Sequence, residues 1–275
     1  MIDFNTCTVI DADELSKSAL TSGTFLRGVI PRQTLYGSPE AMGVPLGDVA
    51  DVLIDLGDAK EIIAECHEHK LFPMYHQDAT WAPDGFQWNQ NGLGYCWTWS
   101  GTGDVMNCQA REGKRKAGDE LLAPVSMGYL VGWRNRGNYL EDFLRGARDH
   151  GIAPASCVPS QHSRDVRNFA SDWEEKAFLN RIAENGVWDC NRSDMLRHSL
   201  SHLRLGVSGH IAYNWWSHAL SLIGVIWDES QPENVRWVIR NSHNETKPII
   251  MTGRRGTPDE CFGVHATATP LTTAT

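Results

Sequence analysis

The hydrophobic periodicity of the chain changes at Gly206. Before this residue, apolar side chains recur at helical spacing, and helices are expected to begin near Cys96, Asn138, Ser171 and Ser193. After it, runs rich in β-branched and aromatic residues predict strands at 207–213, 219–226 and 235–240. Helices that precede strands, instead of alternating with them, predict an α+β fold.

Cys96 stands in the segment Gln-Asn-Gly-Leu-Gly-Tyr-Cys-Trp-Thr-Trp-Ser, which spans residues 90–100. Two glycines before Cys96 allow a sharp turn, and a helix is expected from there towards residue 110, although Gly101 and Gly103 weaken its propensity. A helix N-terminus and a nearby imidazolium both depress the pKa of a thiol. Cys96 is therefore a candidate nucleophile that needs a histidine from elsewhere in the chain.

His218 and Asn241 are the candidate partners of Cys96. His218 opens the apolar run His-Ala-Leu-Ser-Leu-Ile-Gly, and Asn241 follows the last predicted strand in Arg-Trp-Val-Ile-Arg-Asn-Ser. They lie 122 and 145 residues after Cys96, and Gln90 lies six residues before it. Along the chain, four residues of different chemistry thus follow in the order Gln, Cys, His and Asn.

This order resembles that of the papain-like cysteine proteases. The family has a Gln before its Cys-Trp pair, then a His-Ala strand start and an Asn-Ser pair, with His and Asn about 130–150 residues downstream of the Cys. The resemblance covers residues from about 85 to 245. It implies a papain-like two-lobe α+β fold, with a helical left lobe, an antiparallel β-barrel-like right lobe and the active site in the cleft between them.

The resemblance also implies roles for these residues. Cys96 attacks the scissile carbonyl, His218 transfers the proton, and Asn241 orients the imidazole. Gln90 and the backbone N–H of Cys96 form the oxyanion hole. Gln87 is a rival for that hole, but the six-residue spacing favours Gln90. No cofactor and no metal are implied.

Two positions depart from the family pattern. Leu93 stands where the family usually has a disulfide-bonded Cys, so that bridge is absent. His243 replaces the Trp that shields the Asn–His hydrogen bond from water, which leaves the shield weaker or supplied by another Trp. A short connection before His218 predicts a trimmed wall of the substrate cleft.

The resemblance suggests a division of the chain. Residues 1–85 form an acidic N-terminal extension, with 14 Asp/Glu against 5 Lys/Arg. They lack the helical pattern of the common propeptide and are interpreted as an integral or docking segment, with a self-inhibiting segment as the alternative. Residues 86–275 form the catalytic domain. Its expected parts are a helical lobe at about 86–160, an insertion at about 161–190 and a β-rich lobe at about 191–275.

Other chemistry-bearing residues have weaker patterns. The seven cysteines are scattered without a Cys-x-x-Cys pair, which favours buried free thiols over a disulfide framework or zinc. His198 and His202 are four apart on a predicted helix, as metal ligands can be. Since no third ligand accompanies them, we expect surface histidines.

Charge and hydropathy limit the partners. The net charge of −9 without a basic patch argues against nucleic acid, and no apolar run is long enough for a membrane span. The N-terminus lacks the pattern of a secretory signal, which favours a cytoplasmic location or one within a particle or assembly.

The function predicted from the sequence is hydrolysis of a peptide or protein substrate through a Cys-His-Asn triad and a thioester acyl-enzyme. A specialised amidase or exopeptidase of the same fold is a second reading. The alternative from another class is a papain-fold subunit of a larger assembly, such as a virus or phage particle, in which residues 1–85 dock to a neighbour and activity is reduced or lost.

Overall fold

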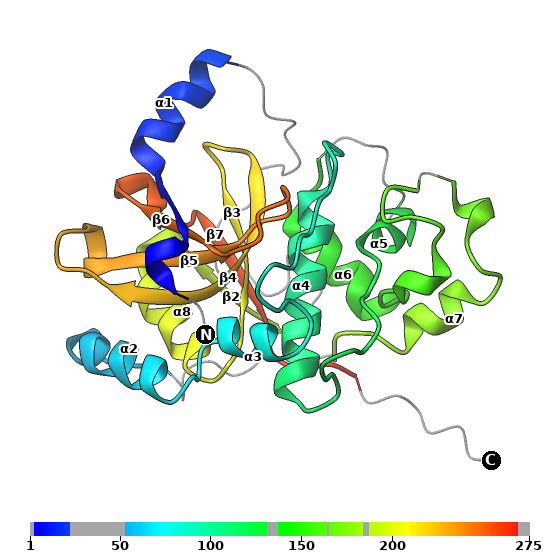
Figure 1. Ribbon diagram of the computed structural model, residues 1–275, viewed down its shortest axis with the longest axis horizontal. Helices are drawn as coiled ribbons and strands as arrows, with labels where there is room; N and C mark the ends of the chain where they lie inside the picture. Colours follow the sequence, from blue (N-terminus) through cyan, green and yellow to red (C-terminus); the bar gives the residue numbers. More distant parts are fainter. Residues whose placement is uncertain are drawn as a thin grey trace.

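The computed structural model describes residues 3–22, 53–130, 132, 137–163, 165–183 and 187–268. One group of helices lies on one side of α4, and the sheet with the remaining helices lies on the other side (Figure 1). The helical lobe contains α4 (Cys96–Arg111), α5 (Pro124–Leu130), α6 (Leu140–Asp149) and α7 (Trp173–Phe178). The α+β, two-lobe fold expected from the sequence is therefore confirmed.

The β-rich lobe is built on one seven-stranded sheet with the strand order β1-β6-β5-β4-β3-β7-β2. Its strands are β1 (Thr8–Asp11), β2 (Val187–Asn191), β3 (Gly209–Tyr213), β4 (His218–Trp227), β5 (Val235–Arg240), β6 (Ile249–Thr252) and β7 (Glu260–Val264). All neighbouring pairs are antiparallel except the parallel pair β1–β6. Because β1 and β2 are edge strands that do not pair with each other, the described sheet is open and not a closed barrel.

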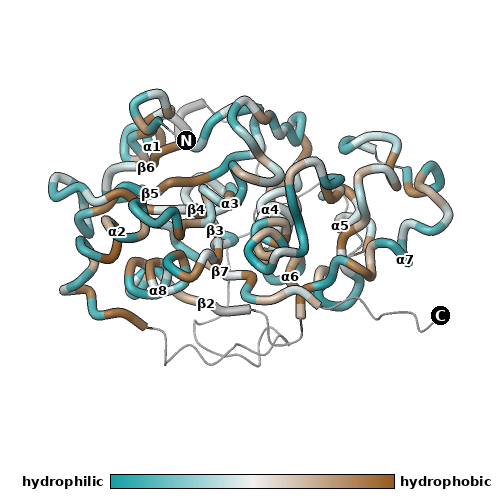
Figure 2. Tube along the Cα trace, turned by 60° about the horizontal axis from the view of Figure 1, so that its bottom comes forward, coloured by the Kyte–Doolittle hydropathy of each residue, from teal (hydrophilic) through white to brown (hydrophobic). Residues whose placement is uncertain are grey.

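Segments from the first 85 residues are part of the β-rich lobe. Strand β1 pairs with β6, and α2 (Ala59–Glu68) and α3 (Pro73–Ala79) contact β4. Helices α1 (Ala12–Ser22) and α8 (Met195–Leu203) complete the set of helices around the sheet. Apolar residues of α2, α3, β4 and β5 share one buried cluster, and Figure 2 shows α2 and α8 next to the sheet that they contact. The boundary at residue 85 remains a prediction, and residues 23–52 lie outside the described part.

Helix α4 is buried along nearly its whole length and contacts both lobes. The two glycines that weaken its propensity have a packing reason. A Cβ added at Gly101 would lie 2.3 Å from the ring of Phe143, and one at Gly103 would lie 3.2 Å from the Trp88 ring. The close approach of α6 thus favours glycine strongly at position 101, and the Trp88 ring leaves little room for a larger residue at position 103.

The helical pattern that begins near Ser171 continues in the sequence to Asn185, but helix α7 is shorter than this pattern predicts. It ends at Phe178, because the backbone N–H of Ile182 donates to the carbonyl of Ala147 and Ile182 pairs with Thr267 in an isolated bridge. These tertiary hydrogen bonds replace the helical ones. Within the described residues, no helix has the length and apolarity needed to cross a bilayer.

Candidate active site

Cys96 is the first residue of α4 and is fully buried. Tyr95 precedes it in a non-helical conformation, with φ −135° and ψ 42°, and provides no side-chain cap. The first N–H groups of a helix have no partner within it and carry a partial positive charge. The sulfur therefore lies where a negative charge is favoured.

The start of β4 lies against this end of α4. The backbone N–H of Ala219 donates to Sγ of Cys96 over 3.3 Å. His218 is the residue immediately before Ala219 and is also buried. One hydrogen bond thus joins the helix that carries the thiol to the strand that carries the imidazole.

His218 is paired with Asn241 at the end of β5. Nε2 of the imidazole lies 2.8 Å from Oδ1 of Asn241. Because the amide oxygen can only accept, Nε2 is the donor, which leaves Nδ1 as the nitrogen for proton exchange. The orienting contact expected between these residues is present in the structure.

Glu245 fixes the side-chain amide of Asn241. Nδ2 of Asn241 donates to Oε1 of Glu245 over 2.8 Å, and the other carboxylate oxygen accepts from the backbone N–H of His243 over 3.1 Å. Since a carboxylate can only accept, the NH₂ group must face Glu245 and the oxygen must face His218. Sequence reasoning missed Glu245, and the available signal was an acidic residue four positions after Asn241.

Gln90 is brought to the Asn241 segment as well. Its backbone N–H donates to the carbonyl of Ser242 over 2.8 Å, and its side-chain oxygen accepts from the Ser242 hydroxyl. Its side-chain nitrogen donates one of two N–H groups to the carbonyl of Leu93 over 2.6 Å. Gln90 is buried, whereas Gln87 is exposed. The structure thus places Gln90 beside Ser242, the residue after Asn241.

Two rings cover His218. The ring of His243 lies 4.8 Å from it between centroids, and that of Trp216 lies 4.7 Å from it in an edge-to-face arrangement. His243 thus occupies the place after the Asn-Ser pair where the family has its Trp, and Trp216 covers a further part of the imidazole. The four residues Gln90, Cys96, His218 and Asn241 are all at most 4% exposed.

Burial lowers the pKa of His218 to about 3, and the nearby charge of His243 adds to this effect, while the hydrogen bond that His218 donates to Asn241 opposes it. At neutral pH the imidazole is therefore uncharged. An uncharged imidazole is able to accept a proton from a thiol.

Within the described residues, the other chemistry-bearing side chains do not form a second cluster of this kind. The seven cysteines are free and buried, as expected. His202 is buried at 1% exposure, so the expectation of a surface histidine is wrong there. Among the described residues, no group of three or more His, Cys, Asp or Glu side chains is placed to hold a metal ion.

Comparison by sequence finds no match to this chain among protein family models or among curated proteins. Comparison by structure does find matches over most of its length. Xylellain, a cysteine protease from Xylella fastidiosa, has a TM-score of 0.56 at 14% identity, over 89% of this chain and 97% of xylellain. The digestive procathepsin L 3 of Tenebrio molitor has a TM-score of 0.52 at 14% identity, over 93% of this chain and 87% of its own.

A third similar structure is the procathepsin B from Trypanosoma congolense, with a TM-score of 0.52 at 11% identity, over 94% of this chain and 89% of its own. At these identities the likeness establishes architecture. The chain has a divergent form of the papain-like cysteine protease fold.

Proposed function

We propose that this protein is a cysteine peptidase that uses Cys96, His218 and Asn241 as its triad. The observation that carries the proposal is the chain of contacts from the Cys96 sulfur through Ala219 and His218 to Asn241, on a papain-like fold. Nucleophile, base and orienting group are then held by α4, β4 and the end of β5.

In the proposed reaction, Sγ of Cys96 attacks the carbonyl carbon of a peptide bond while Nδ1 of His218 takes the thiol proton. The oxygen of the tetrahedral intermediate accepts from the backbone N–H of Cys96 and from the second N–H of the Gln90 side chain. The imidazolium then protonates the leaving amine, and a thioester remains on Cys96. Water, deprotonated by His218, hydrolyses the thioester and releases the acid product.

A thiol-directed epoxide tests the nucleophile directly. We expect intact-mass analysis to show one adduct on the wild-type protein, located on Cys96 and absent in Cys96→Ala. Cys157→Ala serves as the matched control, because Cys157 is another free buried thiol, and it should be labelled like wild type. An unlabelled but folded wild-type protein would speak against the proposal.

A non-catalytic papain-fold subunit of a larger assembly is the second candidate. It is favoured by the complete burial of Cys96 and by the low pKa of His218, since both disfavour a thiolate–imidazolium pair at rest. A stoichiometric partner that co-purifies with a folded protein lacking peptidase activity would support this candidate. Labelling of Cys96 together with peptide hydrolysis would reject it.

A further inference from the structure

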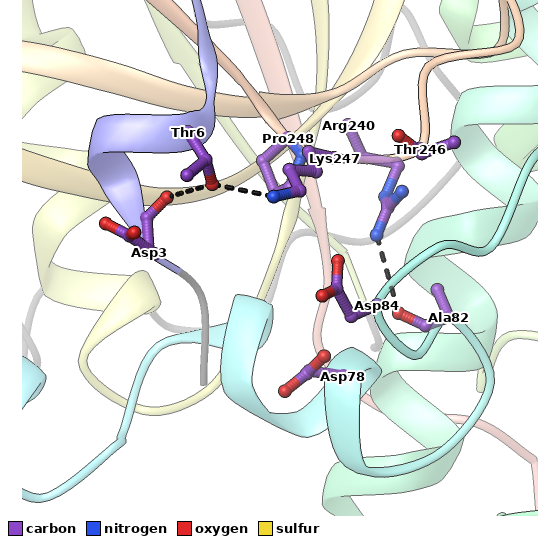
Figure 3. Close-up of a pocket in the computed structure, with 9 residues that line it drawn as sticks. All are labelled: Asp3, Thr6, Asp78, Ala82, Asp84, Arg240, Thr246, Lys247 and Pro248. Carbon is purple, nitrogen blue, oxygen red and sulfur yellow. Dashed lines mark hydrogen bonds between the residues drawn. The ribbon is translucent and has the colours of Figure 1, made fainter.

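The triad of the proposed peptidase is spread over α4, β4 and the end of β5. Strands β4 and β5 are joined by a ladder in which Ser221 pairs with Arg240. Arg240 is the residue before Asn241, and Figure 3 shows its side chain directed towards the carbonyl of Ala82. Helix α4 belongs to no sheet, so its placement against β4 depends on contacts made by side chains.

Two buried serines join α4 to β4 by reciprocal hydrogen bonds. The hydroxyl of Ser100 donates to the carbonyl of Leu220 over 2.9 Å, and the hydroxyl of Ser221 donates to the carbonyl of Ser100 over 2.9 Å. Each serine thus binds the backbone of the other element. We call this pair of hydrogen bonds the serine clasp.

The local structure favours the clasp over simpler contacts. A serine inside a helix is able to donate to the carbonyl four residues before it, which for Ser100 is that of Cys96. Ser100 donates to the strand instead. Gly103 leaves room for the partner serine, because an added Cβ there would lie 3.3 Å from Oγ of Ser221. This part of α4 is therefore shaped to fit the strand serine.

The clasp lies close to the groups assigned to catalysis. Cys96 and Ser100 are four residues apart in α4 and share one face of the helix. Ser221 follows His218 by three residues and shares one face of β4 with Ala219, whose N–H donates to Sγ of Cys96 over 3.3 Å. Because sulfur is a weak acceptor, the two serine hydrogen bonds are the stronger link between the helix and the strand.

We propose that Ser100 and Ser221 are positioning residues that hold the Cys96 sulfur against His218. The inference rests on the proposed peptide hydrolysis, and the serines act through the backbone of α4 and β4. Loss of either hydroxyl allows the helix to shift along the strand, and a misplacement of about 1 Å costs up to about 10²-fold in rate. Since each hydrogen bond supports the other, loss of both should cost less than the product of the two single losses.

Kinetics on a peptide substrate test the role in catalysis, with Ser100→Ala, Ser221→Ala and the double variant compared below their melting temperatures. We expect kcat to fall at least about tenfold in each single variant, with KM nearly unchanged. Ser126→Ala is the matched control, because the buried hydroxyl of Ser126 in α5 likewise donates to a backbone carbonyl, that of Ala123, over 2.8 Å. This control should lose thermal stability and keep its kcat.

Hydrogen exchange at the Ala219 amide, followed by NMR, tests the clasp without reference to activity. We expect exchange at least about tenfold faster in Ser100→Ala and Ser221→Ala than in Ser126→Ala. Should Ser221→Ala fail to fold, Ser100→Ala still decides, since alanine is the better helix former.

The two measurements separate the clasp from the proposed function. A folded wild-type protein that hydrolyses no peptide would refute the function, and exchange at Ala219 would then decide on the clasp alone. Exchange in Ser100→Ala as slow as in Ser126→Ala, or a kcat of Ser100→Ala equal to that of an active wild type, would overturn the positioning role.

Discussion

Glu245 holds the amide of Asn241 from the side opposite His218. The two contacts, Nδ2 to Glu245 and Oδ1 to His218, are both 2.8 Å long. A rotation of the amide by half a turn would set NH₂ against the N–H of the imidazole and the oxygen against a carboxylate. Both new contacts would be repulsive, so Glu245 selects the one orientation that supports His218.

Glu245→Ala should therefore lower kcat and leave KM nearly unchanged. Misplacement of a catalytic group costs up to about 10²-fold in rate, and we expect a decrease approaching this size. Glu245→Gln retains a hydrogen-bond acceptor for Asn241, and its kcat should decrease less than that of Glu245→Ala. Steady-state kinetics on a peptide substrate give the comparison, with Glu68→Ala as a control for loss of an exposed carboxylate. Equal kinetics for wild type and Glu245→Ala would contradict the positioning role.

His243 should set the pKa of His218. Its charge adds to the burial that lowers this pKa to about 3, so His243→Asn removes one lowering influence and should raise the pKa of His218. NMR titration of the imidazole carbons measures the change without reference to activity. Because an uncharged His218 accepts the proton, the acid limb of kcat/KM should move to higher pH in the same variant. If the pKa of His218 is unchanged or lower in His243→Asn, the contact between the two rings does not lower the pKa of His218 electrostatically.

Stability should decrease as the solution is acidified below neutral pH. Burial lowers the pKa of His202, His210 and His218 to about 3 each. The unfolded chain, with values near 6.5, binds more protons between pH 6.5 and about 3, so this contribution is complete above 6.5 and is lost as pH falls towards 3. At pH 5, each of these histidines should lower the free energy of unfolding by about 2 kcal/mol relative to its value at pH 7.5.

His210→Asn isolates one of these contributions. Buried Asp104 acts in the opposite direction, since burial raises its pKa and its contribution is lost as pH rises. Urea unfolding between pH 4 and 6 gives the slope of the free energy of unfolding against pH, and this slope is compared between wild type and His210→Asn. We expect this slope to fall by about 1.4 kcal/mol per pH unit in the variant.

Gly101→Ala should destabilise the fold although alanine is the better helix former. The new methyl group would lie 2.3 Å from the ring of Phe143, and such overpacking typically costs about 1–3 kcal/mol. Gly103→Ala, in the same helix, meets Trp88 at 3.2 Å and should be milder. Thermal unfolding ranks the two variants. The reverse order would show that α4 and α6 are able to move apart at little cost.

The residues with local signatures could be predicted from the sequence. Cys96 at a helix start, His218 at a strand start and Asn241 at a strand end are each marked by neighbouring residues, and the structure places each at such a position. The α+β class followed from the change of period at Gly206. Such features depend on nearby residues, which explains why sequence patterns capture them.

Features that depend on distant contacts could not be predicted. Pairing of β1 with β6 joins residues about 240 positions apart, and no local pattern at Thr8 indicates it. The early end of α7 depends on a hydrogen bond to Ala147 of α6 and on the bridge between Ile182 and Thr267. The role of Glu245 requires knowledge of which way the Asn241 amide faces, and the burial of His202 depends on how α8 packs on the sheet.

Hydrolysis of a peptide library by wild type, Cys96→Ala and Cys157→Ala at pH 5–8, with cleavage sites identified by mass spectrometry, tests the central claim most directly. The account predicts cleavage of peptide bonds by wild type and Cys157→Ala, and loss of at least about 10³-fold in Cys96→Ala. A folded wild-type protein that cleaves no peptide, or a Cys96→Ala protein that cleaves as fast as wild type, would contradict it.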